Sequence, residues 1–157
     1  MDDAGIYARS LPDLGRAVQV GVAGGRIISV SFPRNPDAGA GHGHELLDRI
    51  EAYFDGEPDA FDDVTVALTL PTDRRRVLEA LRGIPYGETV DVAGLARVTP
   101  RLDADDSDAG ETVRAALAEN PAPLLVPDHR VHDGTSAAPT AVADRMRRIE
   151  GIGGAGS

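Results

Sequence analysis

The sequence predicts an α+β fold in two parts, a small mixed α/β domain over residues 1–70 and a helical domain over residues 71–152. Three observations lead to this prediction. Residues 17–32 alternate apolar and polar side chains around a Gly-Gly pair, which is typical of a β-hairpin. From Thr72 onward the apolar residues recur at helical spacing. A hydrophobic content of 41% is enough to form a buried core in a chain of 157 residues.

The N-terminal part is predicted to contain three strands and one helix. The hairpin turns at Gly24-Gly25, and a surface loop rich in Pro, Gly and Asp follows it over residues 33–43. Apolar residues three and four apart predict an amphipathic helix over 44–54. The alternating run at 63–70 predicts a further strand.

The C-terminal part is predicted to begin with three helices. The first is capped by Thr72 and ends at Gly83-Ile84-Pro85. The second begins after Asp91 as N-cap, and the third runs over about 110–119. Two short helices with a turn-bearing connector suit a helix-turn-helix module, although this connector is long for one.

The rest of the chain is predicted to hold a short strand, a turn and a last helix. The apolar run at 124–126 is strand-like, and the polar turn at 127–130 follows it. The last helix covers 140–150, and residues 153–157 form a flexible tail.

The charge and composition limit the functions that the chain can have. The formal net charge is -10, all 16 basic residues are arginine, and cysteine is absent. Without cysteine the chain has no disulfide, no thiolate-bound metal and no reaction that needs a thiolate. The abundant Asp and missing Lys indicate a halophilic or GC-rich source. We expect a cytoplasmic protein that contacts no membrane, because no secretory signal and no long apolar run are present.

An acidic surface also affects nucleic-acid binding. It repels DNA at low ionic strength. In about molar salt the Debye length falls to about 3 Å, and most of this repulsion is screened.

Four segments of the C-terminal half match a known family in order and spacing: Ile84-Pro85-Tyr86-Gly87-Glu88-Thr89, Asn120-Pro121-Ala122-Pro123, Pro127-Asp128-His129-Arg130-Val131 and Arg148-Ile149-Glu150-Gly151. They resemble the O6-alkylguanine-DNA alkyltransferases, which repair alkylated guanine by moving the alkyl group onto a cysteine of their own. The resemblance covers about residues 6–152. It implies an N-terminal ribonuclease-H-like domain and a C-terminal winged helix-turn-helix DNA-binding domain.

The resemblance also assigns roles to the residues of the active-site loop. In the family this loop reads Pro-Cys-His-Arg-Val, and a Glu orients the His that activates the thiol. His129 and Glu150 therefore match the base and the orienting residue, and Asn120 matches the residue that braces the loop. Asp128 occupies the cysteine position. A carboxylate is a far weaker nucleophile than a thiolate, so we expect no alkyl transfer and no enzymatic activity.

Cysteine-less relatives, the alkyltransferase-like proteins, indicate what function remains. They bind alkylguanine in double-stranded DNA and pass the site to excision repair, which implies an excision-repair protein as a partner. We expect a monomer that works without cofactor or metal. A buried Asp128 needs a partner, and protonated His129 is the nearest candidate.

Three departures from the family weaken the DNA-binding prediction. Glu111 occupies the place of the arginine that fills the gap left by a flipped nucleotide, although Arg114 lies one turn later on the same face. Val92 replaces a tyrosine that rotates the phosphate, and Ser136-Ala137 lacks the pocket's aromatic residue. The alternative hypothesis is therefore a degenerate member that binds no DNA and acts as a protein-interaction or regulatory module.

Other clusters have competing interpretations. A basic strip for a duplex would use the arginines Arg74, Arg75, Arg76, Arg114 and Arg130. The turn at 128–130 could serve packing alone, and a hydrolase with Asp128 as nucleophile and His129 as base is a third hypothesis. His42 and His44 could bind a metal, but a surface or capping role is the more common one for such residues. The aspartates of 103–108 fit a solvated acidic loop better than a calcium loop.

Overall fold

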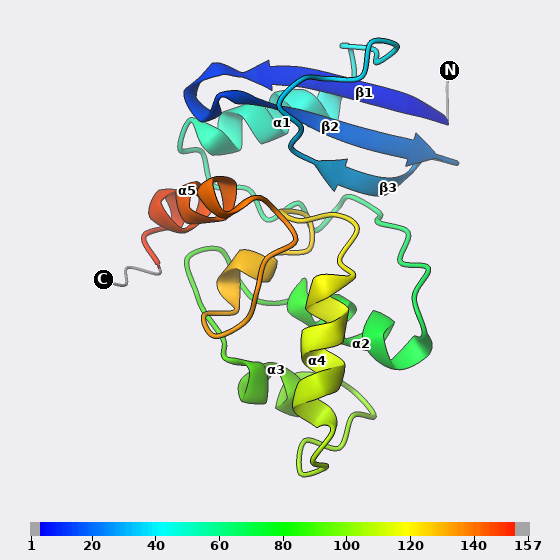
Figure 1. The fold of residues 1–157 in the computed structure, drawn as a ribbon, viewed down its shortest axis with the longest axis vertical. Helices are drawn as coiled ribbons and strands as arrows, with labels where there is room; N and C mark the ends of the chain where they lie inside the picture. The colour runs from blue at the N-terminus through cyan, green and yellow to red at the C-terminus, as the bar shows by residue number, and fades with distance from the viewer. Residues whose placement is uncertain (1–3, 153–157) are drawn as a thin grey trace.

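The computed structural model describes residues 4–152 as a mixed α/β protein with one three-stranded sheet and five α-helices (Figure 1). The antiparallel sheet has the order β1-β2-β3, with the strands β1 (Ala4–Leu11), β2 (Arg16–Ala23) and β3 (Arg26–Ser31). A short 3-10 turn, η1 (Pro12–Leu14), joins β1 to β2. The predicted hairpin is confirmed, and Gly24 and Gly25 both have positive φ (60° and 76°), as its tight turn requires.

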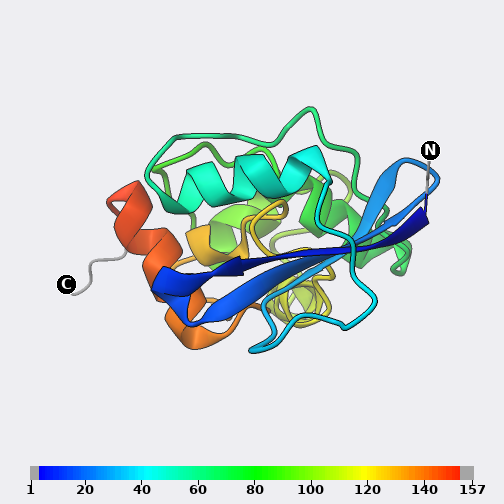
Figure 2. The same cartoon turned by 90° about the horizontal axis from the view of Figure 1, so that it is seen from above.

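Helix α1 (Glu45–Phe54) packs on one face of the sheet, as the view from above shows (Figure 2). His44 is its N-cap and accepts a hydrogen bond from Leu46 N at 3.1 Å. The buried side of the helix carries residues at the predicted helical spacing: Leu46, Leu47, Ile50, Tyr53 and Phe54. The predicted amphipathic helix is therefore confirmed.

Three helices pack together below the sheet in Figure 1: α2 (Thr72–Leu81), α3 (Val92–Val98) and α4 (Ala109–Ala118). Asp91 is the N-cap of α3 as predicted, and its Oδ1 accepts from Gly94 N at 2.6 Å. Thr72 is not a cap, because α2 already begins there and Pro71 stands at the N-cap position. The last helix, α5 (Thr140–Glu150), has the predicted bounds.

Two predicted strands are wrong, and one strand has no counterpart among the predicted elements. Residues 63–70 begin in a turn and form only one bridge, between Val66 and Ile27, because the chain then leaves β3 toward α2. Residues 124–126 cannot pair as a strand, since Leu124 has a φ of 86° and Val126 N bonds back to Ala122 O. β1 was not predicted, and its register is set by eight residue pairs with β2.

Both predicted parts contribute to one hydrophobic core. The cluster of buried side chains includes Val18 and Val20 of β2, Tyr53 and Phe61, Leu95 of α3 and Met146 of α5. Tyr53 also meets Tyr86 edge to face, with ring centroids 6.1 Å apart. Among the helices of residues 4–152, none is long and apolar enough to cross a membrane.

Candidate functional site

The turn at 127–131 is held in place by side chains from two other segments of the chain. It contains the short 3-10 helix η2 (Asp128–Arg130), all three residues of which are buried. Asn120, just after α4, donates from Nδ2 to Val126 O at 3.0 Å and accepts from Ala122 N at 3.0 Å. Arg147 of α5 donates to His129 O at 3.0 Å. The bracing role of Asn120 stays a prediction, and these are the contacts through which it would act.

Asp128 is fully buried, and protein donors occupy both of its carboxylate oxygens. Oδ2 accepts from Asn120 Nδ2 at 2.9 Å and from Ala137 N at 2.7 Å. Oδ1 accepts from Ser136 Oγ at 2.6 Å. The predicted partner, His129, is not among these donors. None of the three carries a charge, so burial dominates and raises the pKa of the Asp128 carboxyl above its usual value.

Glu150, at the end of α5, is the acceptor at the centre of a second buried cluster. Its Oε1 accepts from Arg130 Nε at 2.8 Å and from Gly87 N at 3.1 Å. Its Oε2 accepts from His129 Nε2 at 2.7 Å, from Tyr53 Oη at 2.5 Å and from Arg130 Nη2 at 3.1 Å. Burial opposes ionisation of Glu150, but these hydrogen bonds prevail and hold its pKa well below the usual range.

His129 follows Asp128 directly in the sequence, but its side chain forms a hydrogen bond in the Glu150 cluster and none with Asp128. His129 Nε2 lies 2.7 Å from Glu150 Oε2, and in the neutral tautomer that carries its proton on Nε2 the other ring nitrogen, Nδ1, has a lone pair. Nδ1 is buried and has no hydrogen-bond partner in the described part of the chain. The ring is thus held in the orientation of a base, while the neighbouring Asp128 carboxylate is engaged elsewhere. This arrangement does not assemble the nucleophile and base pair that the hydrolase hypothesis requires.

The α3–α4 helix pair holds the predicted DNA-contacting positions. Val92 is buried, and its N–H donates to Asp133 Oδ1 at 2.7 Å, so the N-terminus of α3 is already occupied by a carboxylate. Glu111 and Arg114 are both exposed on α4. A Cβ added to Gly110 would lie 3.2 Å from Arg114 Nη1 and 4.0 Å from Val92 Cγ1, so the guanidinium lies back against the start of α4.

The arginines predicted to form a basic strip are placed differently from one another. Arg74 Nη1 pairs with Glu119 Oε2 at 2.6 Å, and Arg75 Nε lies 3.9 Å from Glu79 Oε2. Arg76 is half-buried on α2. Arg130 is buried against Glu150 and also donates to Ile84 O at 2.7 Å, so it cannot contact a duplex.

Two further arginines on this module were missed by the sequence analysis. Arg97, in the last turn of α3, and Arg101, just after it, are exposed, and neither has an ion pair within residues 4–152. Arg101 has a φ of 63°, an uncommon conformation for a residue other than glycine. Both arginines lie in or next to the helix that was predicted to follow Asp91, so their sequence positions could have identified them as candidate phosphate contacts.

The remaining candidates occupy ordinary structural roles. His44 caps α1, and His42 Nδ1 lies 3.3 Å from Ala8 O. Asp103 and Asp106 accept backbone hydrogen bonds from Asp105 and Asp108 and so shape the acidic loop. Within residues 4–152 no group of three or more His, Asp or Glu residues could hold a metal ion.

Tyr53 was also missed, although it links the two parts of the chain. It lies on α1, and its hydroxyl reaches Glu150 from 97 positions away in the sequence. Burial, followed by the negative charge of Glu150, raises the pKa of the Tyr53 hydroxyl. A tyrosine on the apolar face of a helix is typical of core packing, so only the fold shows that the Tyr53 hydroxyl contacts Glu150.

Comparison with known proteins supports the relationship that the motifs indicate. Residues 72–149 match the family described as 6-O-methylguanine DNA methyltransferase, DNA binding domain. A DNA base-flipping protein of Thermus thermophilus is 36% identical over 110 residues, covering 68% of this chain and 68% of that protein. A methylated-DNA–protein-cysteine methyltransferase of Methanopyrus kandleri is 40% identical over 91 residues. That match covers 56% of this chain and 62% of the relative, so the chain spans less than two thirds of it.

Solved structures agree at the level of the fold. The crystal structure of Mycobacterium tuberculosis OGT in complex with DNA has a TM-score of 0.67 and 28% identity, covering 93% of this chain and 90% of that one. The O6-methylguanine-DNA methyltransferase of Pyrococcus kodakaraensis has a TM-score of 0.66 and 19% identity, covering 94% of this chain and 98% of that one, and shows the fold alone. On these matches and its motifs, the chain belongs to the methylated-DNA–protein-cysteine methyltransferase family.

Proposed function

We propose that this protein is an alkyltransferase-like member of the family, which binds double-stranded DNA and recognises alkylated guanine without accepting the alkyl group. The observation that carries the proposal is the buried Asp128 at the position of the acceptor cysteine. In this reading the protein marks a damaged site for an excision-repair partner and consumes neither cofactor nor metal.

The environment of Asp128 argues against alkyl transfer. A nucleophile must present a lone pair to the carbon that it attacks, and its reactivity falls when donors stabilise its charge. Asp128 is 0% exposed, and three donors at 2.6–2.9 Å hold its two oxygens. Two of these donors, Ser136 and Ala137, belong to the loop before α5, and their hydrogen bonds hold that loop against the Asp128 carboxylate. A thiolate lost from this site is therefore not replaced by an equivalent nucleophile.

The helix pair supports DNA binding. α3 and α4 pack against each other, and three exposed arginines lie on them or on the loop between them: Arg97 on α3, Arg101 in the loop and Arg114 on α4. Exposed guanidinium groups bind phosphate oxygens well because their donors are planar and always charged. One relative is named a DNA base-flipping protein, and one solved relative is in complex with DNA.

A second candidate function is a protein-interaction or regulatory module without DNA binding. The exposed Glu111 on α4 favours it, as does the acidic loop at 103–108, which leads directly into the same helix. Both would face a phosphate backbone with charge of the wrong sign.

Fluorescence anisotropy with two duplexes separates these candidates. One duplex contains a single O6-methylguanine and the other the matched guanine, and both are titrated from low to about molar salt, where surface repulsion is screened. The proposal predicts binding to both duplexes and tighter binding to the damaged one. Equal affinities would remove the lesion-recognition part, and no complex at any salt would favour the interaction module.

A charge-reversal pair locates the interface. Arg114→Glu should weaken binding to both duplexes by about tenfold, because it removes a phosphate contact and adds repulsion. Arg148→Glu is the matched control, since Arg148 is exposed on α5, outside the helix pair. Equal losses in the two variants would show that only net charge matters.

A further inference from the structure

Residues 65–68, which follow a turn at 62–64, run beside β3 with one paired edge and one open edge. Ile27 N donates to Thr65 O, and Ala67 N donates to Ile27 O, both at 2.9 Å. Because backbone groups alternate between the two edges of an extended chain, those of Val66 and Leu68 face away from β3. Within residues 4–152 neither Val66 nor Leu68 has a backbone hydrogen-bond partner. Beside β3 this segment therefore presents an unpaired backbone edge, with which another extended chain could pair.

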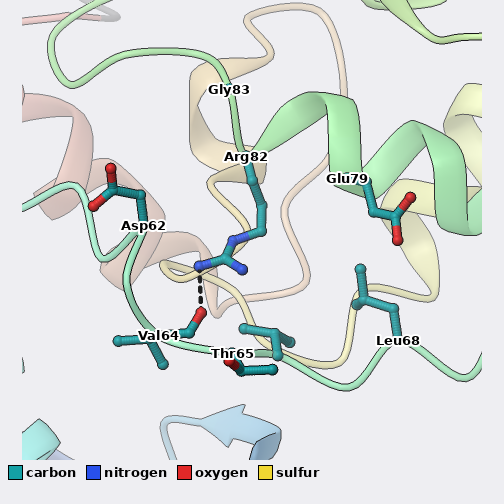
Figure 3. A pocket seen from close by; sticks show the side chains of 8 residues that line it. Asp62, Val64, Thr65, Leu68, Glu79, Arg82 and Gly83 are labelled. Carbon is teal, nitrogen blue, oxygen red and sulfur yellow. Dashed lines mark hydrogen bonds between the residues drawn. The ribbon is translucent and has the colours of Figure 1, made fainter.

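This open edge lines a cavity of about 440 Å³ between the segment and the C-terminal end of α2. Its walls include the half-buried side chains of Val64, Val66 and Leu68. Figure 3 shows Arg82 and Glu79 on the α2 side of the segment. We call this space the 62–83 groove, after the residues that bound it.

The Arg82 side chain at the groove donates its hydrogen bonds to backbone carbonyl oxygens and, within residues 4–152, to no carboxylate. Its Nε donates to Leu125 O at 3.1 Å, and its Nη2 donates to Phe61 O at 2.7 Å and to Val64 O at 2.9 Å. The last of these bonds is drawn in Figure 3 and pins one end of the open edge to α2. The Arg82 guanidinium is thus occupied by hydrogen bonds within the protein.

The two carboxylates of the groove are available to a partner. Figure 3 shows Asp62 and Glu79 on either side of Arg82. The side chain of Glu79 is 58% exposed, and its ion pair in the described part of the chain is a long one, with Arg75 Nε at 3.9 Å. Asp62 is exposed and has no ion pair in the described part of the chain. The groove therefore combines an apolar wall, an open strand edge and two acidic ends.

We propose that the 62–83 groove binds an extended segment of a partner protein, with an apolar centre and basic residues on both sides. The segment adds a strand to the open edge and pairs its backbone with Val66 and Leu68. Its basic side chains meet Asp62 and Glu79. The site is separate from the helix pair, so this inference does not depend on DNA binding.

The first test is NMR titration of the full isotope-labelled chain with a blocked pentapeptide, acetyl-Arg-Val-Ser-Val-Arg-amide. Amide shifts confined to residues 62–70 and 79–83 are expected. The same peptide with Glu in place of both Arg should bind about fivefold more weakly or worse. Shifts elsewhere, no shift at millimolar peptide, or equal binding of the acidic peptide would overturn the proposal.

The second test uses the period-two pattern of strand pairing. One peptide is N-methylated at its central residue, and another at the two flanking Val residues. Strand addition predicts that only one of these weakens binding by about tenfold, because only alternate N–H groups face Val66 and Leu68. Equal effects of the two peptides would contradict it.

A variant pair completes the assignment. Glu79→Arg should weaken the basic peptide by about fivefold and strengthen the acidic one. Glu88→Arg, which makes the same charge change at an exposed residue outside the groove, should alter neither. If both variants act alike, the peptide senses net charge and the groove is not its site.

Discussion

Two buried carboxylates lie in this site, and they are stabilised in opposite ways. Glu150 accepts from a guanidinium, an imidazole, a phenol and a backbone N–H, and its pKa is held well below the usual range. Asp128 accepts from an amide, a hydroxyl and a backbone N–H, and burial raises its pKa. Burial opposes ionisation at both positions, and only at Glu150 do the hydrogen-bond donors outweigh it.

The difference indicates which residue the fold depends on. Glu150 joins α5, the 128–130 turn, the segment before α3 and, through Tyr53, helix α1. Asp128 joins only neighbouring loops, and none of its hydrogen-bond donors within residues 4–152 is charged. We therefore regard Glu150 as structural and Asp128 as a tolerated replacement.

The largest effect should follow Glu150→Gln. Arg130 would then be buried without an anion, and the amide would place N–H groups against existing donors. Loss of one partner of a buried ion pair costs about 3–5 kcal/mol. Urea denaturation measures this loss, with the exposed Glu88→Gln as control. A loss below about 1 kcal/mol would contradict a structural role for Glu150.

Tyr53→Phe should have an intermediate effect. It removes only the hydroxyl that donates to Glu150 and leaves the ring packing intact. Hydrogen bonds to charged groups contribute about 1.5–3 kcal/mol. Thermal or urea unfolding should show this loss, and the loss should shrink in a Glu150→Gln background. Full additivity of the two substitutions would mean that they do not act through one contact.

Asp128→Asn should have the smallest effect, within about 1 kcal/mol at neutral pH. The remaining oxygen can accept from Asn120 and Ala137, while the new amide can donate to Ser136 Oγ. A loss above about 3 kcal/mol would show that the fold needs the charge at this position.

The two variants should also differ in their pH dependence. The raised pKa of Asp128 means that its charge costs stability above the unfolded value of about 3.9, so Asp128→Asn should gain relative stability as the pH rises above about 4. The lowered pKa of Glu150 means that its contribution is present above about 4.3 and fades in acid, so the Glu150→Gln deficit should shrink on acidification. Slopes of the same sign would contradict the comparison.

Local patterns in the sequence predicted the hairpin and α1, α2, α4 and α5 closely, because each buries one face at regular spacing. These patterns predicted strands wrongly at 63–70 and 124–126, because strand formation there depends on whether another strand lies alongside the segment. The motifs singled out Asn120, His129 and Glu150, which the fold brings together at the 127–131 turn, and their functional roles stay predictions. They did not predict the Tyr53 contact or the donors of Asp128, since these depend on how distant loops close over the turn.

The most direct test of the central claim is the intact mass of the protein after incubation with duplex DNA that contains O6-methylguanine. Asp128→Cys serves as the positive control, because His129 and Glu150 keep their positions beside the new thiol. We expect Asp128→Cys to gain one methyl group and the unsubstituted protein to gain none while still binding the duplex. A methyl group stably attached to the unsubstituted protein would contradict the account.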